Sequence, residues 1–247
     1  MSPQIDEVEY WNRVAPIYAS LYERDWSRYE DAVLRADLEK TVSTPNVKRI
    51  LDIGCGTGLA YELIRDLTPS LEYIGFDVSR EMLVEFARRF PDVTLIEGTA
   101  DALLDYFSPS SFDVVIATNV AASFWAETSR VLKLIFSVLA PGGRFHLSFL
   151  NRLALRRIVR GLYHRREQYR TRGDPEMRQY VWAQSFSRRE LIRLFQKAGF
   201  VGLEGSYRSV LGGVWETRAS IMVERTAVSI LPWLGHSITI TGQRPRM

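Results

Sequence analysis

The chain has 247 residues, of which 46% are hydrophobic, and a formal net charge of +3 at neutral pH. This length suits one α/β domain with additions, and the apolar content is ample for a core on both faces of a sheet. The single cysteine excludes an internal disulfide. No leading apolar segment resembles a signal peptide and no stretch approaches the ~20 apolar residues of a membrane span, so we expect a cytoplasmic protein.

Residues 5–42 have a mostly helical pattern and are rich in aromatic side chains. Pro16 interrupts the helical periodicity, which predicts two helical pieces rather than one. We expect residues 1–45 to form a helical cap whose aromatic side chains pack on the sheet of the domain.

The most informative stretch is ILDIGCGTG, at residues 50–58. An apolar run enters three glycines and a helical pattern leaves them from Leu59, which is the strand, turn and helix order of a nucleotide-binding crossover. Glycines allow positive φ and close approach of a ligand, and the first helical turn offers unpaired N–H groups. The spacing is GxGxG, with Leu59 at the place of the third dinucleotide glycine, so NAD and FAD are disfavoured.

An acidic residue followed by GxGxG resembles motif I of the class I S-adenosylmethionine-dependent methyltransferases, of the type that acts on small molecules. Asp52, Gly54, Gly56 and Gly58 carry the motif in this chain. The resemblance implies S-adenosylmethionine as cofactor and S-adenosylhomocysteine as product. It also implies a Rossmann-like, doubly wound α/β fold with seven mostly parallel strands in the order 3-2-1-4-5-7-6, the last-threaded strand being antiparallel.

The same resemblance extends into the cap. The stretch WNRVAPIYASLY is similar to the N-terminal segment of many small-molecule methyltransferases, in which a tyrosine matching Tyr18 closes over the methionine end of the cofactor. Plain aromatic packing is the other role open to Tyr18. We place Tyr22, one helical turn further on, at the acceptor.

The second strand, YIGF, ends at Asp77, and Ser79 suits the N-cap of the helix that follows. The end of this strand lies beside the cofactor ribose in a doubly wound sheet, where a carboxylate accepts hydrogen bonds from both hydroxyls. The resemblance gives that role to Asp77, with Val78 beside it, and places Met82 against the adenine ring. An ordinary turn aspartate and a core methionine are the alternatives.

The third strand, VTLIEG, is followed by Ala100 and Asp101. Asp101 matches a family acid that accepts a hydrogen bond from the adenine amino group, with the Ala100 amide at the ring edge; capping of a short helix is its other possible role. The fourth strand, FDVVIATN, ends at Asn119 and Val120, which we expect beside the cofactor and the acceptor. Asp113 begins this strand at the opposite edge and is predicted to be structural.

A helix over residues 129–140 and the turn APGG lead into the fifth strand, RFHLSFL. His146 lies inside this strand, where a packed histidine and a catalytic base are both open roles. Cys55 is predicted to be a small filler rather than a nucleophile. The three histidines are too scattered in the sequence to predict a metal site.

Residues 151–185 interrupt the family pattern as a basic insertion. Residues 151–172 hold eight arginines and one acid, Glu167, a balance of 8 − 1 = +7, so the rest of the chain sums to −4. Arg156 and Arg160 share one helical face, which is either a solvated surface or a site for an acidic acceptor, a phosphorylated carrier, RNA or an anionic membrane. We expect the insertion to be a mobile lid over the acceptor site rather than part of the sheet.

After the insertion, residues 186–247 are predicted to form a helix between Ser187 and Gly199, a strand over VGLEGSYRSV, a helix over 217–230 and a last strand, HSITITG. The single domain therefore divides into a cap (1–45), a cofactor-binding core (46–150), the insertion (151–185) and a C-terminal part (186–247).

Methyl transfer from a sulfonium is an in-line displacement that needs positioning, and a base only if the acceptor must lose a proton. The leading hypothesis is methylation of O, N or C in a small molecule that is anionic or carrier-bound. An RNA or protein methyltransferase that uses the arginines is the second, although the region TNVAAS lacks the Asn-Pro-Pro-Tyr type signature of amino-group methylases. A protein that binds the cofactor for other chemistry is the third.

Overall fold

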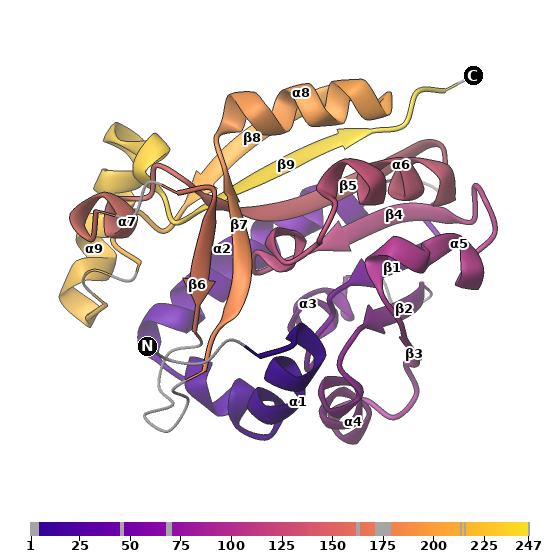
Figure 1. The fold of residues 1–247 in the computed structure, drawn as a ribbon, viewed down its shortest axis with the longest axis horizontal. Coiled ribbons are helices and arrows are strands. Elements are labelled where there is room, and N and C mark those ends of the chain that lie inside the picture. The colour runs from indigo at the N-terminus through magenta and orange to yellow at the C-terminus, as the bar shows by residue number, and fades with distance from the viewer. Residues whose placement is uncertain are drawn as a thin grey trace.

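The computed structural model describes residues 5–44, 47–67, 71–161, 164–170, 179–212, 214 and 216–246. One twisted sheet crosses the molecule and helices pack on both of its faces (Figure 1). Its five parallel strands are β1 (Arg49–Ile53), β2 (Glu72–Asp77), β3 (Thr94–Glu97), β4 (Phe112–Ala117) and β5 (Leu139–Asn151). They lie in the order β3-β2-β1-β4-β5.

Beyond β5 the sheet continues with the two C-terminal strands. β9 (Ser237–Gln243) pairs antiparallel with β5, and β8 (Val201–Arg208) pairs antiparallel with β9. Without the two strands of the insertion, β8 and β9 are the sixth and seventh strands in chain order. The predicted order 3-2-1-4-5-7-6 and the antiparallel last strand are therefore confirmed.

Apolar residues on the central strands alternate between two cores. Leu51 and Val115 pack with α6 and α8 on one face, whereas Ile50 and Val114 pack with α2, α3 and α4 on the other. The helices are α2 (Asp25–Val42), α3 (Leu59–Ile64), α4 (Arg80–Arg89), α5 (Leu103–Tyr106), α6 (Thr128–Val138) and α8 (Arg188–Ala198). Asp113 accepts hydrogen bonds from the N–H groups of residues 48 and 49, as its predicted structural role requires.

The N-terminal cap forms two helices, but the break is not at the proline. α1 (Glu7–Tyr18) contains Pro16 and continues into the short helix η1 (Ala19–Tyr22) before α2 begins. Tyr10, Val14 and Ala15 are buried, and their packing outweighs the one hydrogen bond that the proline cannot donate. The prediction of two pieces is confirmed and its boundary is corrected.

The insertion forms α7 (Leu155–Val159), β6 (Arg166–Tyr169) and β7 (Val181–Phe186). β7 pairs in parallel with the end of β5 and antiparallel with β6. The prediction that the insertion stays outside the sheet is therefore wrong for its second half. β7 joins the sheet because its side chains at 181, 183, 185 and 186 are buried. Part of the insertion, residues 162–163 and 171–178, lies outside the described residues, and so does Arg172.

The C-terminal elements match their signals in the sequence. Ser187 and Glu190 form a capping box at the start of α8, and Gly199 ends the helix with a φ of 99°. α9 (Arg218–Ile230) is capped by Thr217, and a short helix, η4 (Pro232–Leu234), leads into β9. The predicted turn APGG instead forms an irregular start of β5. No helix within the described residues is both long and apolar enough to cross a bilayer.

Candidate active site

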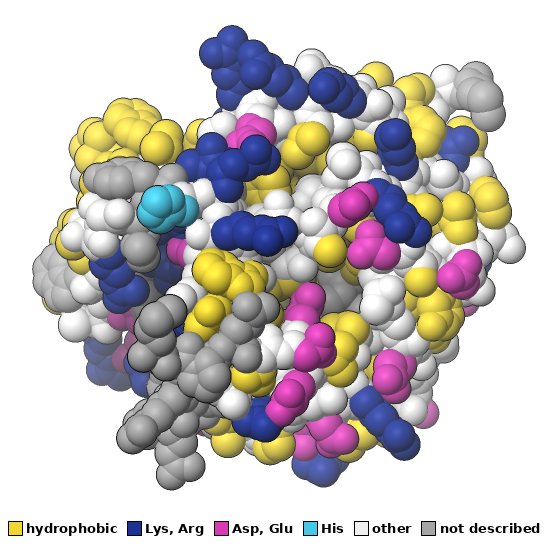
Figure 2. All heavy atoms as spheres, in the orientation of Figure 1, with side chains coloured by type: hydrophobic (Ala, Val, Ile, Leu, Met, Phe, Trp, Pro, Cys, Tyr) yellow, Lys and Arg dark blue, Asp and Glu magenta, His cyan; other side chains and the backbone are white. Residues whose placement is uncertain are grey.

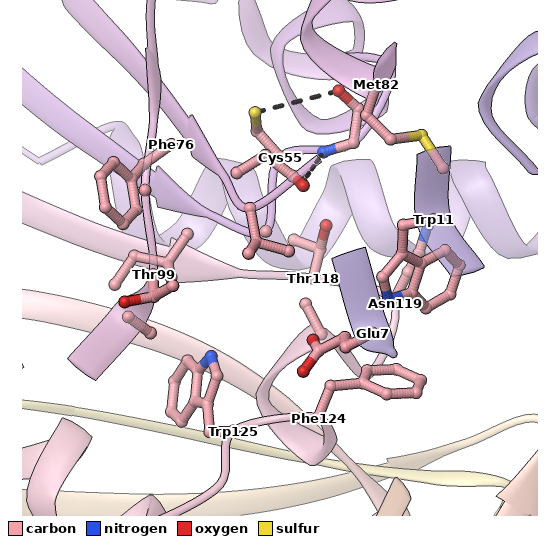
Figure 3. Close-up of a pocket in the computed structure, with 18 of the residues that line it drawn as sticks. Glu7, Trp11, Cys55, Phe76, Met82, Thr99, Thr118, Asn119, Phe124 and Trp125 are labelled. Carbon is pink, nitrogen blue, oxygen red and sulfur yellow. Dashed lines mark hydrogen bonds between the residues drawn. The ribbon is translucent and has the colours of Figure 1, made fainter. Parts of the chain in front are cut away.

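A first cavity of about 190 Å³ lies at the carboxyl ends of β1, β2 and β4 (Figure 3). This is the edge at which ligands bind in open α/β sheets. Its lining comes from the glycine turn, the segment after β2, the segment after β3 including the short helix η2 (Ala100–Ala102), and the turn after β4 with helix η3 (Ala121–Ser123). Helix α1 completes the wall of the cavity with Glu7, Trp11 and Tyr18. The predicted cofactor residues in its lining are Tyr18, Gly54, Gly56, Asp77, Val78, Met82, Ala100, Asp101 and Asn119.

The three motif glycines all have positive φ, but they have different surroundings. A Cβ on Gly54 would lie 2.7 Å from the Ala121 Cβ, and a Cβ on Gly58 would lie 2.7 Å from the ring of Phe86. A Cβ on Gly56 would meet nothing within 4 Å. Gly54 and Gly58 are therefore required by packing, while Gly56 leaves the backbone open to the cavity. Gly58 is not among the lining residues.

Asp77 is held in place at the end of β2. Its two carboxylate oxygens accept hydrogen bonds from the Gly56 N–H at 2.8 Å and the Ser79 N–H at 2.9 Å. Burial raises the pKa of Asp77, while the backbone donors act in the opposite direction. Ser79 also caps α4 by accepting a hydrogen bond from the Met82 N–H at 3.2 Å. The carboxylate keeps lone pairs for hydroxyl donors of a ligand.

Asp101 has a buried oxygen with an unused hydrogen-bonding capacity. Within the described structure its Oδ1 is buried and has no hydrogen-bond partner, although the residue lines the first cavity. A buried, unsatisfied carboxylate oxygen costs free energy until a donor reaches it. A ligand N–H at this position would supply that donor.

The turn after β4 holds two successive residues in the left-handed region. Asn119 has a φ of 47° and Val120 a φ of 61°. A β-branched residue in this region is a conformational outlier that costs about 1–3 kcal/mol. The turn is held by the Ala121 N–H, which donates to the Thr118 carbonyl at 2.9 Å. This strained turn sets Asn119 at the mouth of the first cavity.

α1 contributes residues that the motif analysis missed. Glu7 and Trp11 line the first cavity (Figure 3), and the ring centroids of Trp11 and Tyr18, another lining residue, are 6.1 Å apart. Trp11 makes an edge contact with Phe124, their ring centroids being 5.1 Å apart. Burial, and then the charges of nearby acids led by Asp77, raises the pKa of Glu7 to about 7. Glu7 and Trp11 are four residues apart, which places both on one face of the helix. This spacing is the sequence pattern from which the two residues could have been predicted to share a site.

α1 is fixed to the core by Asn12. The Asn12 Oδ1 accepts hydrogen bonds from the Ser79 Oγ at 2.7 Å and from the Glu81 N–H at 3.3 Å. Since Ser79 follows Asp77 by two residues, the cap helix and the end of β2 are held as one unit. In Figure 2 acidic side chains follow the α1 region beside a hollow near the centre of the view.

A second cavity, of about 460 Å³, adjoins the first. The two share Tyr18, Thr57, Leu59 and Asn119 in their linings. The second cavity lies among α2, β8, α9 and the aromatic residues that follow α1. Tyr22 and Val120, which were predicted to contact the acceptor, both line it.

Two predicted site residues are buried in the sheet instead of lining a cavity. Asp52 accepts a hydrogen bond from the Tyr73 hydroxyl, and its complete burial raises its pKa to about 7. His146 is 1% exposed, and neither ring nitrogen has a hydrogen-bond partner among the described residues. Burial lowers the pKa of His146 to about 3. Neither residue is in the lining of the two cavities.

The predicted arginine sites also lie elsewhere. Arg156 and Arg160 are in the lining of neither cavity. Arg156 lies 3.6 Å from the Glu167 carboxylate, and Arg157 is buried against the same carboxylate. Arg152 and Arg165 both contact Glu190, at 2.7 and 2.9 Å. In Figure 2 the Lys and Arg side chains are dispersed over the visible face.

Comparison with known proteins identifies the core. Residues 50–143 match the family model described as a methyltransferase domain. Trans-aconitate 2-methyltransferase of Variovorax paradoxus is 28% identical over 126 residues, which cover 48% of each chain. Demethylmenaquinone methyltransferase of Thermus thermophilus is 36% identical over 102 residues, which cover 39% of this chain and 44% of the relative. The matches thus span about half the length of these relatives or less.

A solved structure shows the same fold along nearly the whole chain. A chain in the complex between the Haloferax volcanii Trm112 methyltransferase activator and the putative methyltransferase superposes with a TM-score of 0.68. The two are 20% identical, and the match covers 98% of this chain and 99% of the other. Residues 50–143 thus match a methyltransferase domain model, and the whole chain has the fold of this solved structure, with the sheet order described above.

Proposed function

We propose that this protein transfers a methyl group from S-adenosylmethionine to O, N or C of a small-molecule acceptor. The cofactor would occupy the first cavity and the acceptor the second. One observation carries the proposal: the two cavities meet at Tyr18, Thr57, Leu59 and Asn119, at the carboxyl edge of the sheet. Two ligands that must react with each other need adjoining sites of this kind.

The residues of the first cavity fit the cofactor. Asp77 would accept hydrogen bonds from the ribose hydroxyls, because its carboxylate is already fixed by two backbone N–H groups. The unpartnered Oδ1 of Asp101 would accept from the adenine amino group. The open space above Gly56 allows the ligand to approach the backbone. Each role rests on an acceptor oxygen or a space that the fold leaves available.

In this proposal the chain acts mainly by position, since methyl transfer needs a base only where the acceptor must lose a proton. Bound S-adenosylmethionine supplies a methyl group activated by the positive sulfonium. Tyr18 and Asn119 lie where the cavities join and would align the acceptor, while Trp11 and Phe124, whose rings contact each other in the lining of the first cavity, would shield the bound cofactor from water. His146 is too deeply buried, and too weakly basic, to take a proton from an acceptor.

The size of the acceptor is inferred from the second cavity and from the relatives. The relatives are named for trans-aconitate and demethylmenaquinone, both small molecules. An RNA or protein acceptor recognised by the arginine-rich insertion finds less support, because four of the described arginines there contact Glu167 or Glu190. A cofactor-binding protein with other chemistry would have the same first cavity.

The experiment is incubation with methyl-labelled S-adenosylmethionine and a cell extract separated into small-molecule, RNA and protein fractions. We expect label to enter the small-molecule fraction, and to do so much more slowly with the Asp77→Ala variant. Label found only in RNA or protein would contradict the proposal. A protein that binds S-adenosylhomocysteine but transfers no label to any fraction would favour the third possibility.

A further inference from the structure

The walls of the second cavity are more acidic than basic, although the whole chain is basic. The charged residues in its lining are Glu23, Arg28, Glu30, Asp31, Glu62, Arg89, Arg208 and Glu224. Three arginines against five acids give a formal balance of 3 − 5 = −2. The surplus of negative charge lies in the cavity that adjoins the first one, where an acceptor would bind.

Each arginine in this wall already contacts a carboxylate. Arg28 lies 3.6 Å from Asp25, and Arg208 lies 2.6 Å from Asp37. Arg89 contacts Glu62 and donates a further hydrogen bond to the Thr57 carbonyl at 2.9 Å. The positive charge of these arginines is therefore already balanced within the protein, most completely at Arg208, whose pair with Asp37 is largely shielded from water. They offer a bound anion less than three unpaired guanidinium groups would.

Among the described residues, Asp31 is a partly buried acid in the wall without such compensation, whereas Glu23, which also has no ion pair there, is exposed. Asp31 lies on α2, and the described residues give it no hydrogen bond or ion pair. Burial, and then the charge of Glu62, raises the pKa of Asp31 to about 6, so it is mostly ionised at neutral pH. Glu224, by contrast, is satisfied by the N–H groups of Val210 and Leu211. A cation beside Asp31 would relieve its unfavourable environment.

Aromatic side chains line the same cavity as these carboxylates. Tyr18, Tyr22, Tyr29, Tyr169 and Tyr207 all line the second cavity, and they come from five separate elements. The rings of Tyr18 and Tyr22 are 5.0 Å apart at the junction with the first cavity. Aromatic faces attract organic cations through the ring quadrupole, and they also pack against apolar parts of the same molecule.

We propose that the second cavity binds a small organic cation, such as a protonated amine, with Asp31 as its specificity-determining residue. The proposal rests on the proposed function for the identity of this cavity as the acceptor site. The proposal concerns the cationic group that the cavity recognises. The methylated atom is a separate matter, and it can be any O, N or C atom of the bound molecule. It replaces the anionic acceptor that the basic insertion suggested.

The first test uses the small-molecule fraction of the extract with labelled S-adenosylmethionine. Once unreacted S-adenosylmethionine, itself a cation, has been separated by chromatography, we expect the labelled product to be retained by a cation exchanger at pH 7. The Asp31→Asn variant should lower the labelling rate at limiting extract about tenfold, since one charge-assisted contact is lost. Asp105→Asn, which removes an equal charge from an exposed site outside both linings, should leave the rate unchanged.

The second test measures binding without methyl transfer. Benzylamine and benzoate, which are similar in size and opposite in charge, are titrated into the protein saturated with S-adenosylhomocysteine. Benzylamine should bind at least about tenfold more tightly, and Asp31→Asn should remove most of that preference while leaving S-adenosylhomocysteine affinity unchanged. The preference should also decrease as added salt shortens the Debye length below about 8 Å.

A product retained by an anion exchanger, equal or tighter binding of benzoate, or an unchanged preference in Asp31→Asn would each overturn the proposal. An extract that accepts no label at all rejects the proposed methyl transfer, whereas the benzylamine and benzoate titrations still decide the charge selectivity of the cavity. The two failures are therefore distinguishable.

Discussion

At the scale of single residues, the glycine turn combines two different requirements. Gly54 and Gly58 are glycines because a side chain would collide with Ala121 or Phe86, whereas Gly56 faces open space in the protein. A valine at 56 would therefore be obstructed by the cofactor and by the backbone conformation, not by a neighbouring residue. This difference allows ligand binding and packing to be tested separately.

Gly56→Ala should abolish most cofactor binding while the protein stays folded. The new methyl group would enter the space that the cofactor needs, and the left-handed φ of 53° adds about 1–2 kcal/mol of strain. We expect calorimetry to show at least a tenfold loss of S-adenosylhomocysteine affinity and denaturant unfolding to show only that modest loss of stability. Gly54→Ala is the matched variant, and its larger loss of stability should come from the contact with Ala121. Normal cofactor affinity in Gly56→Ala would mean that the turn is only structural.

Strand alternation explains why two predicted site residues are absent from the cavities. Asp52 lies between Leu51 and Ile53, which pack on the α6 face, so its side chain points to the opposite face and meets Tyr73. His146 alternates in the same way with Phe145 and Leu147. Asp52 could be found from the local sequence because it belongs to the glycine motif, but its hydrogen-bond partner, Tyr73, lies on another strand. By contrast, Asp77, Asp101 and Asn119 follow strand ends, and the fold brings those positions together.

At the scale of elements, a buried ion pair links α7 to β6 within the insertion. Arg157 on α7 is 1% exposed, and its guanidinium contacts the Glu167 carboxylate on β6 and donates to the His164 carbonyl at 2.7 Å. One of the eight arginines in residues 151–172, Arg157, therefore has a structural role. The sequence predicted the charge excess but not this pairing, because a contact between two elements has no local signal.

Glu167→Gln should destabilise the insertion strongly. Breaking a buried ion pair leaves an uncompensated charge, which costs about 3–5 kcal/mol of unfolding free energy. Urea denaturation with fluorescence detection measures the loss. Glu72→Gln removes the half-exposed partner of Arg49 and should cost no more than about 1 kcal/mol. Equal effects of the two variants would show that burial of Arg157 does not matter to stability.

At the scale of the whole molecule, hydrophobic periodicity and the glycine turn were enough to predict an α/β fold with a ligand site after the first strand, whereas the order of the strands was implied only by the family resemblance. Both signals are local, and the resemblance to a known fold supplied the arrangement in space. The second cavity could not be predicted in this way. Its walls combine α2, β8, β9 and α9, which are widely separated in the sequence, and the sign of its charge depends on which arginines are already paired.

The net charge of the chain is likewise a poor guide to the charge of its sites. The described arginines of the insertion lie outside both cavities, while acids gather in the first cavity at Glu7, Asp77 and Asp101. A cofactor with a positive sulfonium suits that environment better than a dinucleotide with a negatively charged pyrophosphate.

The most direct measurement is isothermal titration calorimetry of the wild-type protein and Asp77→Ala with S-adenosylhomocysteine and with NAD. We expect the wild type to bind S-adenosylhomocysteine and not NAD. Asp77→Ala should bind S-adenosylhomocysteine at least about tenfold more weakly, because hydrogen bonds to a fixed carboxylate are lost. NAD binding by the wild type, or an unchanged affinity for S-adenosylhomocysteine in Asp77→Ala, would contradict the assignment of the first cavity.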